Sequence, residues 1–174
     1  MNLINIKSPA DLKGLSIAEL TDLTAQARQA LMTKVSEHGG HVGPPMGAAE
    51  MIMALHYVFN SPVDKIVYDV SHQSYVHKMV TGRALAFLDH NHYDDVTGYT
   101  DPTESEHDFF NIGHTSTSIS LASGLATARN LKGDSENIIA IIGDGSLSGG
   151  EAFEGLDYAA TLDSNMIIIV NDND

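Results

Sequence analysis

Apolar residues near the start of the chain recur with the period of a helix. Intervals of three and four residues, which place side chains on one helical face, separate Leu20, Leu23, Ala27, Leu31 and Val35. Ser16 and Glu19 precede this run in the spacing of a capping box, and Gly39-Gly40 follows it. The pattern therefore predicts a helix that begins after Ser16 and ends before Gly39.

The next stretch predicts a turn, a helix, a strand and a loop in succession. Glycine and proline are concentrated in residues 39–47, which favours a turn. A second helix is expected after it, with a shared face formed by Met51, Ile52, Leu55, Val58 and Phe59. Residues 65–70 form a β-branched run typical of a strand, and residues 71–79 are compatible with a helix. Residues 82–110 are polar and acidic and predict a long loop with one short helix at 84–88.

Helical and extended patterns alternate in the second half of the chain. A helix of small residues is expected to open at residues 113–118 and to run to about Asn130. A strand at 137–142, a helix at 148–162 and a strand at 165–170 follow. The apolar run Ile167–Val170 suits a strand buried on both faces. This alternation predicts an α/β fold with a parallel sheet covered by helices on both faces.

Composition narrows the class of protein. A chain of 174 residues that is 43% hydrophobic suits one domain with a real core. Nine basic against 23 acidic residues give a net charge of −14, which disfavours nucleic acid or an anionic membrane as partner. The absence of cysteine excludes disulfides and thiol chemistry. No leader and no continuous apolar stretch of membrane-spanning length is present, so we expect a cytoplasmic protein.

Polar residues follow the last two predicted strands. Asp144 lies in Gly143-Asp144-Gly145, and Asn173 lies in Asn171-Asp172-Asn173. A right-handed parallel crossover brings the carboxyl ends of such strands to one edge of the sheet, where α/β folds bind ligands. Oxygen donors favour Mg²⁺, and no Lys or Arg after residue 133 could neutralise a diphosphate. The pair therefore predicts a phosphate-bridging Mg²⁺ site, although each motif taken singly is a common turn.

Three of the nine histidines lie beside Gly or Ser at predicted element ends: His41, His72 and His114. They could transfer protons or contact a cofactor, or they could be capping or core residues. No His-x-x-x-His pair supports a zinc site. His77 is expected to be structural, and the remaining loop histidines, expected to be solvated, are His90, His92 and His107.

Together these segments resemble a known enzyme family. The Gly-Asp-Gly and Asn-Asp-Asn motifs resemble the thiamine diphosphate signature of transketolase-like enzymes, and residues 69–78 and 113–120 resemble 1-deoxy-D-xylulose-5-phosphate synthases. Ser71 stands where that family often has glycine, and Val76 where it often has proline. Residues 43–50 are closer to the transketolase version of that turn.

The resemblance implies a thiamine diphosphate-binding fold and a role for each matching residue. The implied Mg²⁺ ligands are Asp144 and Asn173. The implied cofactor contacts, with the diphosphate held at positions 145 and 146, are His72, Gly113, His114, Thr115, Gly145, Ser146 and Asn173. His41 would be the catalytic residue, transferring a proton or positioning substrate.

The resemblance also implies a reaction. A synthase of this kind condenses pyruvate with D-glyceraldehyde 3-phosphate, releases carbon dioxide and feeds isoprenoid and thiamine synthesis. The alternatives are a transketolase-type ketol transferase and a domain fragment without chemistry of its own. The family has several domains and is expected to be homodimeric, and residues 1–174 would be the first part of its diphosphate-binding domain. Because the family's activating glutamate lies on another domain, we expect these residues alone to be inactive.

Overall fold

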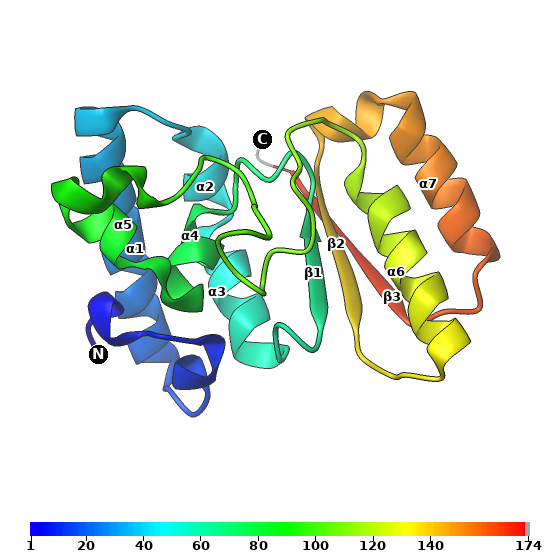
Figure 1. Ribbon diagram of the computed structural model, residues 1–174, viewed down its shortest axis with the longest axis horizontal. Coiled ribbons are helices and arrows are strands. Elements are labelled where there is room, and N and C mark those ends of the chain that lie inside the picture. The colour runs from blue at the N-terminus through cyan, green and yellow to red at the C-terminus, as the bar shows by residue number, and fades with distance from the viewer. Residues whose placement is uncertain (173–174) are drawn as a thin grey trace. The chain divides into compact units, whose positions relative to one another are not determined.

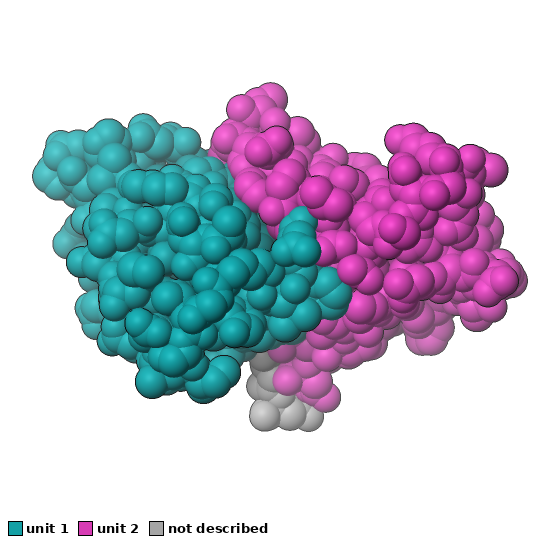
Figure 2. Space-filling model, turned by 90° about the horizontal axis from the view of Figure 1, so that it is seen from below, with its two compact units in different colours: residues 1–60, 72–99 teal, residues 61–71, 100–174 magenta. Residues whose placement is uncertain are grey.

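The computed structural model describes residues 1–172, which form two compact units (Figure 2). Unit 1 comprises residues 1–60 and 72–99, and unit 2 comprises residues 61–71 and 100–174. The chain therefore passes between the units three times, and each unit contains segments that are distant in sequence. No helix among the described residues has the length and apolar character needed to cross a membrane.

Unit 1 is helical (Figure 1). Its α-helices are α1 (Ile17–His38), α2 (Gly43–Gly47), α3 (Ala49–Val58), α4 (Tyr75–Lys78) and α5 (Leu85–Leu88). Its shorter helical turns are η1 (Leu3–Asn5), η2 (Pro9–Leu12), η3 (Met79–Arg83) and η4 (His90–Asp95).

The first predicted helix is confirmed as α1. The Ser16 hydroxyl accepts a hydrogen bond from the Glu19 N–H at 3.3 Å, and the Glu19 carboxylate accepts one from the Ser16 N–H at 2.8 Å. These reciprocal bonds satisfy amides that the first helical turn leaves without partners, and such a cap contributes about 1 kcal/mol. The buried face includes the predicted Leu20, Leu23, Ala27 and Leu31. Capping and periodicity therefore agree on this helix.

Two expectations for the segment after α1 are wrong. The predicted turn at 39–47 contains helix α2, because proline at its second and third positions, Pro44 and Pro45, suits the first turn of a helix. The predicted face of α3 is wrong at Val58, which is 63% exposed as the last helical residue. Residues 82–110 contain the expected short helix, α5, but also the helical turn η4.

Unit 2 contains a three-stranded parallel sheet in the order β1-β2-β3 (Figure 1). The strands are β1 (Lys65–Tyr68), β2 (Ile138–Gly143) and β3 (Met166–Asn171). The helices α6 (Ser118–Lys132) and α7 (Gly150–Thr161) lie beside the sheet, and the turn η5 (Gly145–Ser148) follows β2. The predicted α/β class, with parallel strands flanked by helices, is confirmed.

The core of unit 2 lies between β2 and α6. Alternate residues of β2 pack with a stripe of small and branched residues on α6, and all are fully buried: Ile138, Ala140, Ile142, Ile119, Ala122 and Ala126. The expected burial of Ile167–Val170 is wrong, since β3 is only partly buried and Val170 is 48% exposed. Among the described strands β3 pairs with β2 alone, so its other edge has no strand partner.

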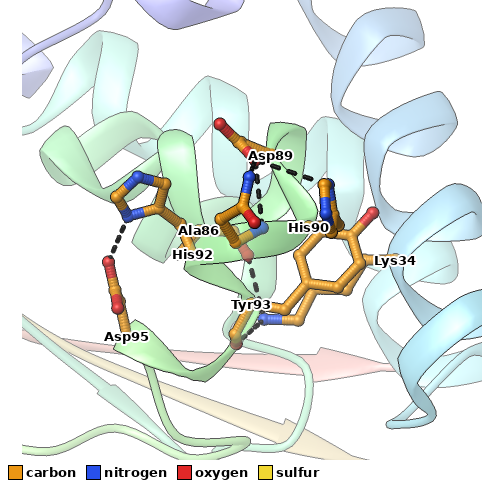
Figure 3. Close-up of polar contacts among 8 residues, drawn as sticks. Lys34, Ala86, Asp89, His90, His92, Tyr93 and Asp95 are labelled. Carbon is orange, nitrogen blue, oxygen red and sulfur yellow. Dashed lines mark hydrogen bonds and ion pairs between the residues drawn. The ribbon is translucent and has the colours of Figure 1, made fainter.

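Polar contacts hold the segment around η4 in unit 1 (Figure 3). The buried Lys34 ammonium donates to the carbonyl oxygens of Ala86 at 3.0 Å and Tyr93 at 2.7 Å. The Asp89 carboxylate accepts from the Asn91 N–H at 3.0 Å and caps η4. Of the three loop histidines expected to be solvated, His107 in unit 2 is 8% exposed, so that expectation is wrong for it.

The pKa of His92 is expected to fall when Asp95 is replaced by asparagine. The hydrogen bond from His92 Nδ1 to Asp95 Oδ2, 2.6 Å long, raises the pKa of His92 above its usual value. Because the folded pKa is raised, this pair stabilises the fold below the unfolded pKa of His92 and ceases to do so as pH rises through the folded one. An NMR titration of His92 measures the change. Asp94→Asn is the control, since Asp94 pairs with His38 at 3.0 Å, and an equal shift of His92 there would contradict the assignment.

Candidate cofactor and proton-transfer sites

The chain turns sharply at the carboxyl end of β1. Val70 and Ser71 adopt left-handed conformations with φ of 56° and 69°, which non-glycine residues seldom adopt. The family that this sequence resembles often has glycine at position 71, and glycine would adopt this conformation without strain. The Ser71 hydroxyl instead adds two contacts, accepting from the Thr100 N–H at 2.9 Å and donating to the Ile112 carbonyl at 2.8 Å. Ser71 therefore joins the turn to the loop that precedes α6.

Asp69, immediately before this turn, holds the start of α6. Its carboxylate is 1% exposed and accepts two backbone N–H bonds of 2.9 Å each, Oδ1 from Ser116 and Oδ2 from Ser118. A carboxylate there also lies at the positive end of the α6 dipole. Sequence reasoning did not identify Asp69 as a site residue. The available signal was an acidic residue directly after a buried strand.

The loop before α6 packs closely on the loop after β2. The Ser116 hydroxyl donates to the Ser146 carbonyl at 2.7 Å. A Cβ built on Gly149 would overlap that hydroxyl and lie 2.8 Å from the Ser116 Cβ, so only glycine permits this approach. The structure thus brings together, through Ser116, the segments that contain two predicted groups of cofactor contacts: Gly113, His114 and Thr115, and Gly145 and Ser146.

Gly149→Ala is expected to lower the free energy of unfolding by about 1–3 kcal/mol, the usual cost of inserting a methyl group into packed structure. The new methyl group would displace Ser116 and break its bond to Ser146. Chemical denaturation measures the loss. Gly150→Ala is the matched control, because a Cβ there meets nothing within 4 Å. Equal stability of the two variants would show that the loops separate without cost.

The carboxyl ends of β2 and β3 meet as predicted. Gly143 pairs with Asn171, and the Asp144 N–H donates to the Asn171 carbonyl at 3.2 Å. Asp144 is exposed, and within residues 1–172 its carboxylate has no hydrogen-bond or ion-pair partner. The second predicted metal ligand, Asn173, lies outside the described residues.

The backbone after Asp144 presents donors. In the described part of the chain, the N–H groups of Gly145 and Ser146 have no acceptor, since the first bond of η5 is from the Leu147 N–H to the Asp144 carbonyl. Successive free N–H groups form a typical anion-binding arrangement. The same described residues contain no group of three His, Cys, Asp or Glu side chains able to hold a metal. The Mg²⁺ site expected from the sequence does not need such a group, because its ligands would be one carboxylate, one amide oxygen and phosphate oxygens.

His114 is exposed and has a defined tautomer when neutral. Its Nδ1 lies 2.8 Å from the Thr115 carbonyl oxygen, which can only accept, so Nδ1 carries the hydrogen. Nε2 is then free to accept a hydrogen bond from a ligand. The residue borders a cavity of about 210 Å³ that is also lined by Gly113, Thr117, Leu121 and Glu151.

In unit 1 the structure brings His41 and His72 together. Their ring centroids are 5.4 Å apart and nearly perpendicular. The rings of Tyr99, at 5.4 Å, and Tyr75, at 6.0 Å, also surround His41. Partial burial lowers the pKa of His41, so its imidazole is neutral near pH 7. A neutral imidazole can both accept and donate a proton.

Comparison with known proteins identifies the family. Residues 3–174 match the family described as 1-deoxy-D-xylulose-5-phosphate synthase. Curated synthases of that name are similar: that of Caldanaerobacter subterraneus is 51% identical over 99% of this chain and 28% of its own length. The Pelotomaculum thermopropionicum synthase is 47% identical over 99% of this chain and 27% of its own. The chain thus spans between a quarter and a third of these relatives, and it belongs to the 1-deoxy-D-xylulose-5-phosphate synthase family.

Proposed function

We propose that the protein containing these residues condenses pyruvate with D-glyceraldehyde 3-phosphate to form 1-deoxy-D-xylulose 5-phosphate and carbon dioxide, with thiamine diphosphate and Mg²⁺. This product would supply isoprenoid and thiamine synthesis. The chain's contribution is the first part of the diphosphate-binding domain. The observation that carries the proposal is the edge of the β2-β3 sheet, where an unpartnered Asp144 carboxylate adjoins free backbone N–H groups in the described chain.

The residues present fit the proposed groups. A hard cation such as Mg²⁺ binds few protein oxygens and keeps phosphate oxygens, so Asp144, with Asn173, suits it. The N–H groups of Gly145 and Ser146 would donate to the diphosphate. The bound thiamine would supply an electron sink for the carbanion chemistry of decarboxylation and carbon–carbon bond formation.

The histidines would orient the organic part of the cofactor and the substrate. His72 and the Gly113-His114-Thr115 segment are proposed to contact the cofactor, and the free Nε2 of His114 supports an accepting role there. His41 is proposed to be the catalytic residue. Its burial disfavours the charged form, which keeps an imidazole available to accept a proton near neutral pH.

A donor screen on the complete protein tests the proposal. With thiamine diphosphate, Mg²⁺ and D-glyceraldehyde 3-phosphate, we expect pyruvate to release carbon dioxide and yield the deoxy sugar phosphate. The second candidate function, transketolase-type ketol transfer, is favoured by the Gly43-Pro44-Pro45-Met46-Gly47 helix α2. Exchange between ketose and aldose without carbon dioxide release would establish that function and exclude the synthase.

A polypeptide of residues 1–174 alone is expected to show no turnover. The relatives are more than three times as long as this chain. The family resemblance implies that the activating glutamate lies on another domain. The same donor assay on this polypeptide checks the point, with the complete protein as positive control. Carbon dioxide release above the enzyme-free rate would contradict it.

We further propose a homodimeric, cytoplasmic protein. Large apolar side chains on α7 are exposed, Phe153 at 60% and Tyr158 at 47%, and such surface favours association. A sequence without cysteine suits a reducing compartment. Sedimentation analysis of the complete protein would establish the oligomeric state.

A further inference from the structure

Tyr75 is buried beside His41 in unit 1. It is the first residue of α4, it is 4% exposed, and its ring packs against Phe87 with centroids 5.3 Å apart. The hydroxyl accepts a hydrogen bond from the backbone N–H of His41 at 3.3 Å. Tyr75 therefore contacts both the backbone and the ring of His41.

Two glycines leave the space that this hydroxyl occupies. A Cβ on Gly40, where φ is 131°, would lie 2.9 Å from the Tyr75 Oη, and a Cβ on Gly98 would lie 3.4 Å from it. The Gly98 Cβ would also lie 3.6 Å from Nε2 of His41. The hydroxyl thus fits between two segments of backbone that are distant in sequence, and the titratable edge of His41 faces one of them.

A cavity of about 270 Å³ adjoins this arrangement. Its lining includes His41, Tyr75 and Gly98, together with the titratable side chains of Lys34, His38 and Tyr93. Within residues 1–172, the other rings that face His41 are His72 and Tyr99. With open space on one side, the orientation of the His41 ring depends on the contacts that remain on the others.

We propose that Tyr75 is a positioning residue that fixes the backbone and ring of His41 for proton transfer. The inference rests on the proposed catalytic role of His41. Burial raises the pKa of the Tyr75 hydroxyl, so the hydroxyl stays protonated near neutral pH. The hydroxyl determines where the imidazole lies.

The variant Tyr75→Phe removes the hydroxyl and keeps the ring packed on Phe87. In the complete protein with thiamine diphosphate and Mg²⁺, we expect kcat to fall about tenfold with little change in the KM for pyruvate, the pattern of a lost transition-state interaction. Without the hydroxyl, the His41 ring becomes more mobile and more exposed to water, which raises its pKa. The acid limb of the pH profile of kcat should therefore move to higher pH. The matched control is Tyr93→Phe, a buried tyrosine whose hydroxyl bonds Glu37 at 3.2 Å. The kcat of Tyr93→Phe should stay within about twofold of that of the parent protein.

A second readout does not require turnover. In protein labelled with ¹³C-histidine, the His41 signal is identified by its loss in His41→Gln and is titrated by NMR. Tyr75→Phe should move this signal and its midpoint, and Tyr93→Phe should not. Equal effects of both variants, or none, would overturn the positioning role. If Tyr75→Phe does not fold, Gly98→Ala, whose methyl group contacts the hydroxyl and Nε2, is expected to move the same signal. If the parent protein lacks synthase activity, the proposed function is rejected. The NMR titration still decides whether Tyr75 positions His41.

Discussion

Replacement of Asp69 by asparagine is expected to lower the free energy of unfolding by about 1–4 kcal/mol. Both carboxylate oxygens accept backbone N–H bonds, from Ser116 and Ser118, but an asparagine amide group can accept only one. The other buried N–H would face a donor and remain unsatisfied, which costs about 1–3 kcal/mol. Loss of the negative charge at the start of α6 adds about 0.3–1 kcal/mol. Denaturant titration measures the change.

The same substitution is expected to weaken thiamine diphosphate binding, because Asp69 fixes the loop that contains Gly113, His114 and Thr115. Asp64→Asn provides the matched control. Asp64 is another buried carboxylate, at the opposite end of β1, and accepts the Asn137 N–H at 2.7 Å. Both variants should unfold more easily, but only Asp69→Asn should bind the cofactor more weakly. Equal weakening would mean that general destabilisation, rather than the loop, limits binding.

Asp144→Asn is expected to have the opposite profile, with little effect on stability and a large effect on binding. The carboxylate is exposed and has no partner within the described residues, so the free energy of unfolding should change by less than about 0.5 kcal/mol. Asparagine keeps one oxygen donor but removes the negative charge that attracts Mg²⁺, and since loss of outer-shell groups alone weakens metal sites about 10–100-fold, we expect a loss of at least about tenfold. Calorimetric titration of thiamine diphosphate in Mg²⁺ measures this loss.

Asp157→Asn controls for the change in net charge. Asp157 is also exposed in unit 2, on α7, and is not a proposed ligand. Its variant should bind thiamine diphosphate as the parent does. Retention of full affinity by Asp144→Asn, or equal loss in both variants, would contradict the proposed role of Asp144 as a metal ligand.

The elements that local sequence specifies were predictable. Helix α1 combines apolar periodicity with a capping box, and β2 is an apolar run ended by glycine, so their positions follow from neighbouring residues alone. Helix α2 was missed because glycine and proline favour turns and helix starts alike. The burial of β3 was overestimated because an apolar run does not reveal whether a strand lies at an edge.

Some features of the candidate sites also follow from local sequence, and others depend on the tertiary fold. The ends of β2 and β3 could be placed together from the crossover between them, and the structure confirms that Asp144 follows β2 at the edge where β3 also ends. The bonds of Asp69 to residues 47 and 49 positions away depend on the tertiary fold, and no local pattern predicts them. The contact of His41 with Tyr75, across 34 positions, was unpredictable for the same reason.

The most direct test of a thiamine diphosphate site at the β2-β3 edge is calorimetric titration of the cofactor into the complete protein, with Mg²⁺ and then with a chelator. We expect saturable binding with Mg²⁺ that disappears when the metal is removed, because this part of the chain offers the diphosphate no Lys or Arg after residue 133. Binding of equal strength without any divalent cation, or no binding in its presence, would contradict the proposed site.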